Sequence, residues 1–276
     1  MKKKIFFIFF YALLVAFGIE ISDCLNAADY TLPERTELSE IASKETLTQS
    51  DYELIFLQTG LGKRAVDELR EENDTEFYQT LLSFQTQCFS PVETERRYLF
   101  FPTTIADVLK DGEGVRRLQL PPLKNGDILI TKSTKTLLYR HGHAAIVVDA
   151  DRGRVVEAMM LGMPSGKTFI DGWESYGTLA VLRPKTDKET IKKAVEFAEK
   201  KMVGVPYRLL TGIIDKDKSD NNNISSTHCS HLVWQAYRAS GIELDSDGGW
   251  LVSPGDLFDS EELELVFSYG FAEKKK

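Results

Sequence analysis

Cysteine and histidine are scarce in this chain of 276 residues, which has three cysteines and four histidines. If Cys24 is removed with a leader segment, only Cys88 and Cys229 remain, and a small secreted fold stapled by several disulfides is excluded. The alternative of one bridge between these two cysteines requires close, well-oriented backbones. The hydrophobic core must therefore stabilise the fold, and the 42% hydrophobic content is ordinary for a globular protein.

The chain also lacks an excess of positive charge and any internal repeat. Its net charge is -8 and its pI is near 5.2, with lysines and acidic residues mixed along the sequence. Binding to a phosphate backbone needs a basic stripe or patch, which this pattern does not provide. We therefore expect no nucleic-acid partner.

The apolar run that stands out is at the N-terminus. Lys2, Lys3 and Lys4 precede an uncharged apolar stretch at 5–19, and small residues follow at 27–28. This layout predicts a signal peptide over residues 1–27 and a protein exported to the periplasm, the cell envelope or the medium. A retained single-pass anchor is the alternative, although a spanning helix needs about 20 apolar residues.

The first half of the remaining chain favours helix. Between about Tyr30 and Leu109, apolar residues recur at helical spacing, as at Leu54, Ile55 and Leu61, and the pattern continues beyond glycine breaks. We therefore predict a helical N-terminal domain over residues 28–118. This part of the sequence has no histidine, and no paired acidic motif or Gly-rich phosphate loop stands out in it. Its expected role is therefore that of a structural cap.

The second half, residues 119–276, alternates short β-rich runs with two helices. The turn 149–153 contains Asp and Gly, which suit a hairpin between two strands. A helix is expected over 188–202, ending at Gly204, and a second one is expected up to Gly241, capped by Ser225, Ser226 or Thr227. The predicted strands of one antiparallel sheet are 127–131, 144–148, 154–158 and 178–182.

All four histidines fall into two short clusters, at 141–143 and 228–231. Cys229 lies within the second cluster in the first turn of a predicted helix, where the helix dipole lowers the pKa of a thiol. His143 opens the strand 144–148, where it can act as the base, and His141 is expected on the same strand face. Glu157 lies in the next strand across the hairpin, where its carboxylate can fix the imidazole tautomer.

These residues resemble a known family, the circularly permuted NlpC-like cysteine hydrolases of the YiiX type. In ordinary papain-like enzymes the cysteine precedes the histidine, whereas the permuted group reverses that order, as this chain does. The similar segments span 123–257 and are Leu123-Lys124-Asn125-Gly126-Asp127-Ile128-Leu129, Gly142-His143-Ala144-Ala145-Ile146-Val147-Val148, Val155-Val156-Glu157-Ala158, Gly204-Val205-Pro206-Tyr207, Cys229-Ser230-His231-Leu232-Val233-Trp234 and Ser253-Pro254-Gly255-Asp256-Leu257.

The resemblance implies an α+β, permuted papain-like fold in which a small antiparallel β-barrel packs on helices. It further implies a thiol hydrolase acting on amide or ester bonds, with peptidoglycan peptides or lipids as substrates. Tyr207, His228 and Asp127 are the expected substrate contacts, and no cofactor or metal is expected. Many relatives carry Asp-Cys-Ser-Gly at the nucleophile, so His228 and His231 are departures that affect the oxyanion site.

Three alternatives remain open at the level of the sequence. The same cysteine could serve a lipid acyltransferase or lipase. The domain could be a catalytically inactive module that binds cell wall or lipid. Finally, the clustered histidines together with Cys229 could ligate zinc in a metallohydrolase, although the arrangement lacks acidic partners.

Overall fold

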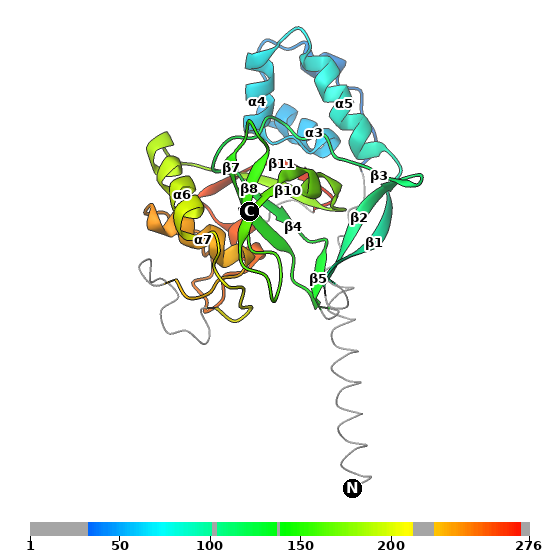
Figure 1. Cartoon of the computed structure of the whole chain (residues 1–276). Coiled ribbons are helices and arrows are strands. Elements are labelled where there is room, and N and C mark those ends of the chain that lie inside the picture. Colours follow the sequence, from blue (N-terminus) through cyan, green and yellow to red (C-terminus); the bar gives the residue numbers. More distant parts are fainter. Residues whose placement is uncertain (1–32, 101–103, 137–138, 212–223, 272–276) are drawn as a thin grey trace.

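The computed structural model describes residues 33–100, 104–136, 139–211 and 224–271 (Figure 1). The predicted signal peptide, residues 1–27, lies outside these ranges, so its removal and the export of the protein stay predictions. Within the described ranges, no helix combines the length and the apolar character that crossing a membrane requires.

The described chain begins with helices, as the sequence predicts. Thr48 caps α3 in a capping box with Asp51, and α3 ends at Gly60, whose φ of 74° is the left-handed conformation that favours glycine. Gly60 also lies against the strand β11, Leu263–Tyr269, because a Cβ there would sit 2.1 Å from the carbonyl oxygen of Ser268. The helices are α2 Ser39–Ala42, α3 Gln49–Thr59, α4 Lys63–Glu72 and α5 Phe77–Phe89.

The predicted helical domain over 28–118 is wrong in its last part. After α5 the chain forms three strands of a second sheet, β1 Glu93–Phe100, β2 Thr104–Asp111 and β3 Gly114–Val115. In β2, Ala106 and Val108 are both buried and lie two residues apart, which is the period of a strand with one buried face. Helical periodicity therefore ends before this segment, and burial against a neighbouring layer determines its structure. In this sheet β1 and β2 are followed by β5 Thr134–Thr136 and β6 Tyr139–Arg140.

The main sheet has six antiparallel strands in the order β11-β10-β4-β7-β8-β9. The four predicted strands are confirmed, and so is the hairpin between β7 and β8. Because the strand order in the described residues is an open path, the expected closed β-barrel is wrong for them, whereas the mixed α+β class is confirmed. The strands are β4 Ile128–Thr131, β7 His143–Asp149, β8 Arg154–Glu157, β9 Gly166–Phe169, β10 Leu179–Pro184 and β11 Leu263–Tyr269.

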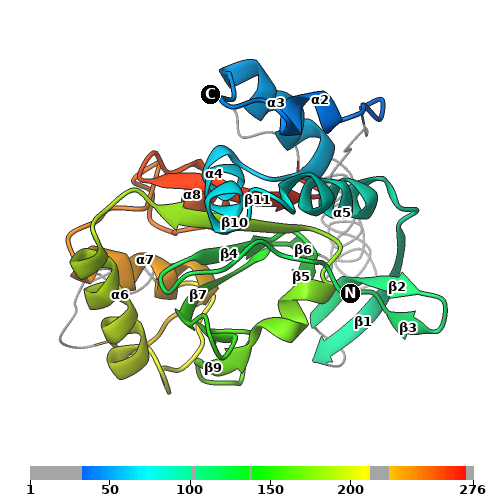
Figure 2. The same cartoon turned by 90° about the horizontal axis from the view of Figure 1, so that it is seen from above.

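The two faces of the main sheet carry different helices, because successive strand residues point to opposite sides. On β7, Ala145 and Val147 belong to the core shared with the N-terminal helices. Ala144, Ile146 and Val148 belong to the core shared with the later helices. These are α6 Lys188–Lys201, α7 Cys229–Ala239 and the short α8 Pro254–Asp259. Figures 1 and 2 show α3, α4 and α5 grouped on one side of the sheet, away from α6 and α7.

Candidate active site

Cys229 is the first residue of α7, which packs its buried apolar face on the main sheet. The residue before it, His228, is the N-cap, and its Nδ1 accepts a hydrogen bond of 3.4 Å from the backbone N–H of His231. The predicted caps Ser225, Ser226 and Thr227 are therefore wrong, because an imidazole nitrogen takes the acceptor role usually filled by a hydroxyl. The Cys229 side chain starts where backbone N–H groups have no partner within the helix.

His143 is the first residue of β7 and is almost fully buried. His143 meets Glu157 on the diagonal of the β7–β8 ladder. Glu157 pairs directly with Ala145, and His143 lies two residues before Ala145 on the same face. Nε2 of His143 lies 2.7 Å from Oε2 of Glu157. The prediction that Glu157 meets the His143 ring across the hairpin is confirmed, and Nδ1 is the ring nitrogen left to face the thiol.

Two further side chains hold the Glu157 carboxylate. The hydroxyl of Thr168, on β9, donates to Oε1. The indole N–H of Trp173 donates to Oε2 over 3.2 Å, and its ring stacks on that of His143 with centroids 5.0 Å apart and 15° between the planes. Trp173 belongs to the 3-10 helix η1, Ile170–Ser175. Sequence reasoning missed both residues. Thr168 and Phe169, which favour strands, could have indicated β9 after the Glu157 strand, but no local signal points to Trp173.

The electrostatics of the three residues favour a thiolate beside an imidazolium. Burial opposes ionisation of Cys229, but hydrogen bonds from His143 and His228 outweigh it and hold the thiol pKa well below its usual value. Burial also opposes the charged form of His143, yet Cys229 and Glu157 together raise its pKa to about 10. Glu157 is buried too, and the hydrogen bonds it accepts, first from His143, keep its pKa lowered.

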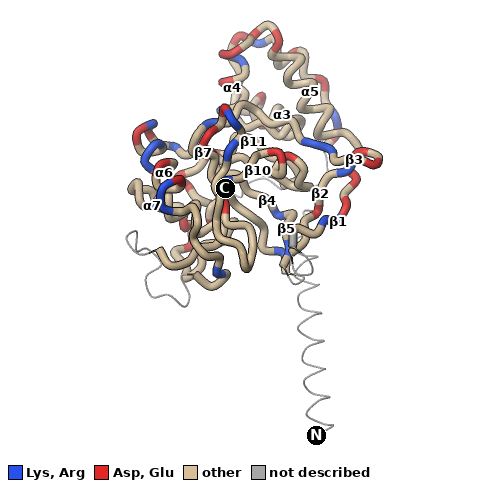
Figure 3. The backbone as a smooth tube through the Cα atoms, in the orientation of Figure 1, with Lys and Arg blue, Asp and Glu red and all other residues tan. Residues whose placement is uncertain are grey.

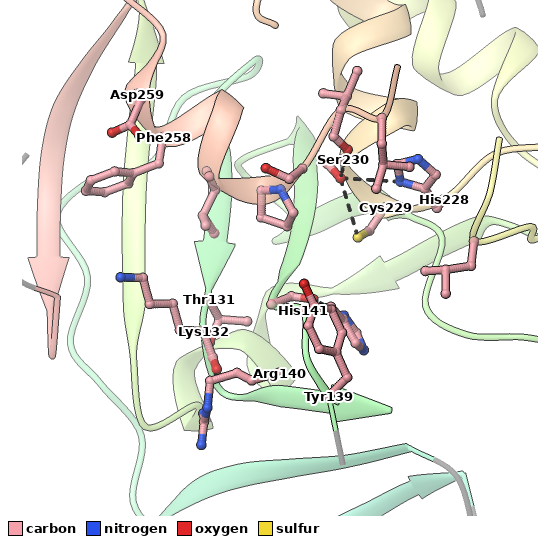
Figure 4. Close-up of a pocket in the computed structure, with 18 of the residues that line it drawn as sticks. Thr131, Lys132, Tyr139, Arg140, His141, His228, Cys229, Ser230, Phe258 and Asp259 are labelled. Atoms are coloured by element: carbon pink, nitrogen blue, oxygen red, sulfur yellow. Dashed lines mark hydrogen bonds between the residues drawn. The ribbon is translucent and has the colours of Figure 1, made fainter. Parts of the chain in front are cut away.

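A cavity of about 790 Å³ opens onto Cys229. Figure 4 shows Cys229, His228 and Ser230 on one side of it and Lys132 and Arg140 at the opposite end. The structure thus brings the predicted substrate contacts Tyr207 and His228 to the nucleophile. Apolar and aromatic residues form much of the wall: Ile130, Tyr139, Tyr207, Leu209, Leu210, Leu251, Val252, Pro254, Phe258 and Phe271.

The other histidines have distinct places. His141 does not share a strand face with His143, so that expectation is wrong: Gly142, with a φ of 71°, turns the chain between β6 and β7. The His141 ring lines the cavity, and its Nε2 lies 2.8 Å from the hydroxyl of Thr136. His231 points its Nδ1 to the hydroxyl of Thr227 at 3.1 Å. The ring that Glu157 holds is that of His143.

Asp127 was expected to contact substrate, and the structure places it elsewhere. Its side chain is buried and ion-paired with Arg183, whose Nε and Nη2 lie 2.7 and 2.6 Å from the two carboxylate oxygens. Nη1 of Arg183 lies 2.7 Å from Glu68 on α4. The substrate-binding assignment of Asp127 is therefore wrong. Through Arg183, Asp127 links the start of β4 to Glu68 on α4.

The two cysteines in the described part of the chain, Cys88 and Cys229, are unbridged and buried. The alternative of a zinc site built on the clustered histidines finds little geometric support. Among the described residues, the ligand atoms that come within 4.8 Å of one another in a group of three belong to acidic residues far along the chain, Asp245, Asp247 and Asp256. The nitrogen Nε2 of His143 is already held by Glu157.

Comparisons of the chain with protein-family models, with curated proteins and with solved structures give no match. The geometry of the site is therefore the basis for assigning a function.

Proposed function

We propose that this protein is an exported thiol-dependent hydrolase that cleaves amide or ester bonds through Cys229, His143 and Glu157. The observation that carries the proposal is the convergence of three buried side chains from three separate elements. A thiol at a helix N-terminus meets an imidazole whose far nitrogen is held 2.7 Å from a carboxylate. Nucleophile, base and orienting group in this order form the arrangement of a covalent acyl-transfer site.

The proposed reaction has two acyl-transfer steps. The Cys229 thiolate attacks the carbonyl carbon of the substrate, and the developing oxyanion is placed near the free N–H groups that begin α7. The His143 imidazolium then gives its proton to the leaving amine or alcohol, which leaves a thioester on Cys229. Water then attacks the thioester, and neutral His143 accepts a proton from it. Collapse of the intermediate releases the acid and restores the Cys229 thiolate beside the His143 imidazolium. Glu157 holds the His143 ring throughout without being consumed.

The order of the elements supports a permuted papain-like fold as the framework. The strand that bears His143 precedes the helix that bears Cys229, and that helix packs against the same sheet. The open sheet departs from the barrel that the resemblance implies. The proposal of this fold therefore depends on the relative placement of the histidine strand and the cysteine helix.

The substrate is proposed to be a peptidoglycan peptide or a lipid of the cell envelope. The apolar wall of the cavity favours the second candidate, an acyl ester hydrolysed or transferred through Cys229, because such a wall suits an alkyl chain. A peptide backbone would require polar partners along its length.

The deciding experiment traps the acyl-enzyme. The protein is incubated separately with purified cell-wall peptides and with lipid esters, quenched in acid, and digested for mass spectrometry. An acyl group on the Cys229 peptide, absent from Cys229→Ala, is expected with one of the two substrate classes. Substrate that binds without an adduct or product would instead favour an inactive binding module. Loss of activity on chelation, restored by zinc, would favour the metallohydrolase.

A further inference from the structure

The surface around the mouth of the cavity exposes an unusual set of large apolar side chains. Of the eleven such side chains exposed in the described part of the chain, three line the cavity, Trp250 is next to a lining residue, and three more lie on two segments that are joined beside Tyr207; we call these seven the apolar rim. Its most exposed member is Trp250, with 75% of the residue surface accessible to solvent. A soluble protein rarely leaves a tryptophan so bare unless something covers it. The rim consists of Tyr139, Leu161, Met163, Val203, Leu209, Leu210 and Trp250.

The rim residues come from one short strand, β6, and three loops, of which two line the cavity and the third is joined to one of these two. Tyr139, Leu209 and Leu210 line the cavity directly, and Trp250 precedes the lining residue Leu251. The loop that carries Leu161 and Met163 is fastened to the segment that leads to Tyr207. There the N–H of Ser165 donates to the carbonyl of Val205, and Pro164 bridges to Pro206.

The charge around the rim is mixed. Asp245, Asp247 and Asp256 adjoin the segment that carries Trp250, and Asp259 lines the cavity. The segments 158–166, 202–211 and 248–255 themselves contain no acidic residue. Arg208 is exposed among them, and Lys132 and Arg140 lie at the far end of the cavity in Figure 4. Arg140 is paired with Asp107, so we assign contact with anions to Arg208, which lies on a rim segment, and to Lys132 in the cavity wall. In Figure 3 the loops at the lower edge are largely tan.

We propose that the apolar rim docks this protein on the surface of a lipid bilayer, so that the substrate reaches Cys229 from the membrane. Separate loop tips bearing Trp, Tyr and Leu suit a bilayer interface, where each side chain inserts independently. A protein partner would instead require a continuous complementary face. The cations Arg208 and Lys132 match lipid phosphates.

Delivery of substrate to Cys229 rests on the proposed function. Docking would bring the cavity mouth against the lipid and give an acyl chain a path along an apolar wall. It does not need turnover for its test. Binding is therefore measured on Cys229→Ala, and the hydrolase is assayed separately on the parent protein with soluble esters or peptides. Failure of docking and failure of catalysis then give different results.

Tryptophan fluorescence provides a readout at the rim itself. The chain has three tryptophans, and Trp173 and Trp234 are each 2% exposed, so Trp250 alone is open to lipid. Cys229→Ala is mixed with vesicles of phosphatidylcholine and phosphatidylglycerol, with or without bromine atoms on the acyl chains. Bromine quenches tryptophan on contact. We expect quenching that disappears in the further variant Trp250→Phe.

Matched surface variants test whether the rim is responsible. Leu209→Ser combined with Leu210→Ser should weaken vesicle binding by at least about tenfold, because apolar area is lost from the contact. Val92→Ser combined with Tyr98→Ser removes two exposed apolar side chains beside or on β1 and should leave binding unchanged. Circular dichroism confirms that each variant is folded.

Three results would overturn the inference. One is quenching that persists without Trp250, and another is an equal loss of binding in the Val92 and Tyr98 control. The third is dimerisation in sedimentation that the Leu209 and Leu210 variant abolishes, with no vesicle binding by the parent, because the rim would then join two copies of the chain. Hydrolysis of soluble substrate by the parent would stand in each of these cases.

Discussion

Glu157 and His143 are not direct neighbours across the β7–β8 ladder; their side chains meet on the diagonal, with Nε2 and Oε2 2.7 Å apart. The diagonal leaves the ring free to turn its Nδ1 toward the helix that carries Cys229. Because Trp173 stacks on the same ring and donates to the same carboxylate, the imidazole is held both in plane and in tautomer.

Replacing the orienting carboxylate should be less harmful than removing the base. General acid–base catalysis contributes about 10²- to 10⁴-fold, so we expect His143→Ala to lower kcat/KM by about 10⁴-fold and Glu157→Gln by about 10²-fold. Steady-state assays with the substrate found by acyl trapping measure both. Full activity of Glu157→Gln would remove Glu157 from the mechanism.

The two described cysteines should react very differently with iodoacetamide. Burial raises the pKa of Cys88 to about 11, whereas His143 and His228 hold that of Cys229 well below its usual value. At neutral pH, Cys229 should therefore be alkylated first, and activity should fall in step with its labelling by mass spectrometry. Cys229→Ser should be inactive because a hydroxyl ionises far less readily.

The same experiment includes a control for metal chemistry. Exhaustive chelation should leave the labelling rate and the activity unchanged. Preferential labelling of Cys88, or activity that survives complete alkylation of Cys229, would contradict the thiol mechanism.

Much of the proposed catalytic triad could be predicted from the sequence because its signals are local. Period-two alternation placed His143 and Glu157 on adjacent strands, and the turn 149–153 made those strands a hairpin, which brings the two side chains close. The polar loop before Cys229 placed the cysteine at the start of a helix. These inferences need only the spacing within one or two neighbouring elements.

The parts that sequence reasoning missed depend on contacts between distant segments. Trp173 follows β9 in a short 3-10 helix, and only the folded sheet shows that its indole lies on His143. Asp127 was expected to be a site residue because it lies in one of the segments that carry the family resemblance, yet its partner Arg183 is 56 residues away. The strand β2 escaped notice because burial of alternate residues against the rest of the protein, not helical spacing, orders it. The strand β1, exposed over 93–98, is held by its pairing with β2.

The ion pair of Asp127 should matter for stability and not for catalysis. Breaking a buried pair leaves an uncompensated charge and costs about 3–5 kcal/mol; because Glu68 still faces Arg183, we expect Asp127→Asn to lower the free energy of unfolding by about 3 kcal/mol. Denaturant titration measures the change. Turnover per folded molecule should stay at the parent level, and a selective loss of substrate affinity would restore a binding role for Asp127.

Trp173 should act as a positioning residue through its two contacts with the triad. Trp173→Phe keeps an aromatic face for His143 but removes the donor to Glu157, and we expect a lower kcat with little change in KM. Trp173→Ala removes both contacts and should lower kcat further. An effect confined to thermal stability, with kcat unchanged in both variants, would assign Trp173 a packing role alone.

The pH dependence of the site follows from the opposite pKa shifts of its members. The reactive ion pair exists above the lowered pKa of Cys229 and below the pKa of His143 near 10, so kcat/KM should be flat through neutral pH and fall on an alkaline limb near 10. Since Glu157 helps to raise the pKa of His143, Glu157→Gln should move this limb to lower pH. An alkaline limb unmoved in that variant would contradict the coupling.

The same shifts set the sign of a stability difference between the parent and Glu157→Gln. A lowered carboxyl pKa stabilises the fold above the ordinary value of 4.5, and this stabilisation is lost as the pH falls through the folded value. A raised imidazole pKa stabilises it below the ordinary value of 6.5, and this is lost as the pH rises toward about 10. The loss of unfolding free energy in Glu157→Gln should therefore be greatest between about pH 4.5 and 6.5 and shrink on either side. Denaturant titrations across this range test it, and a difference that grows steadily with pH would show that His143 is neutral when paired with Glu157.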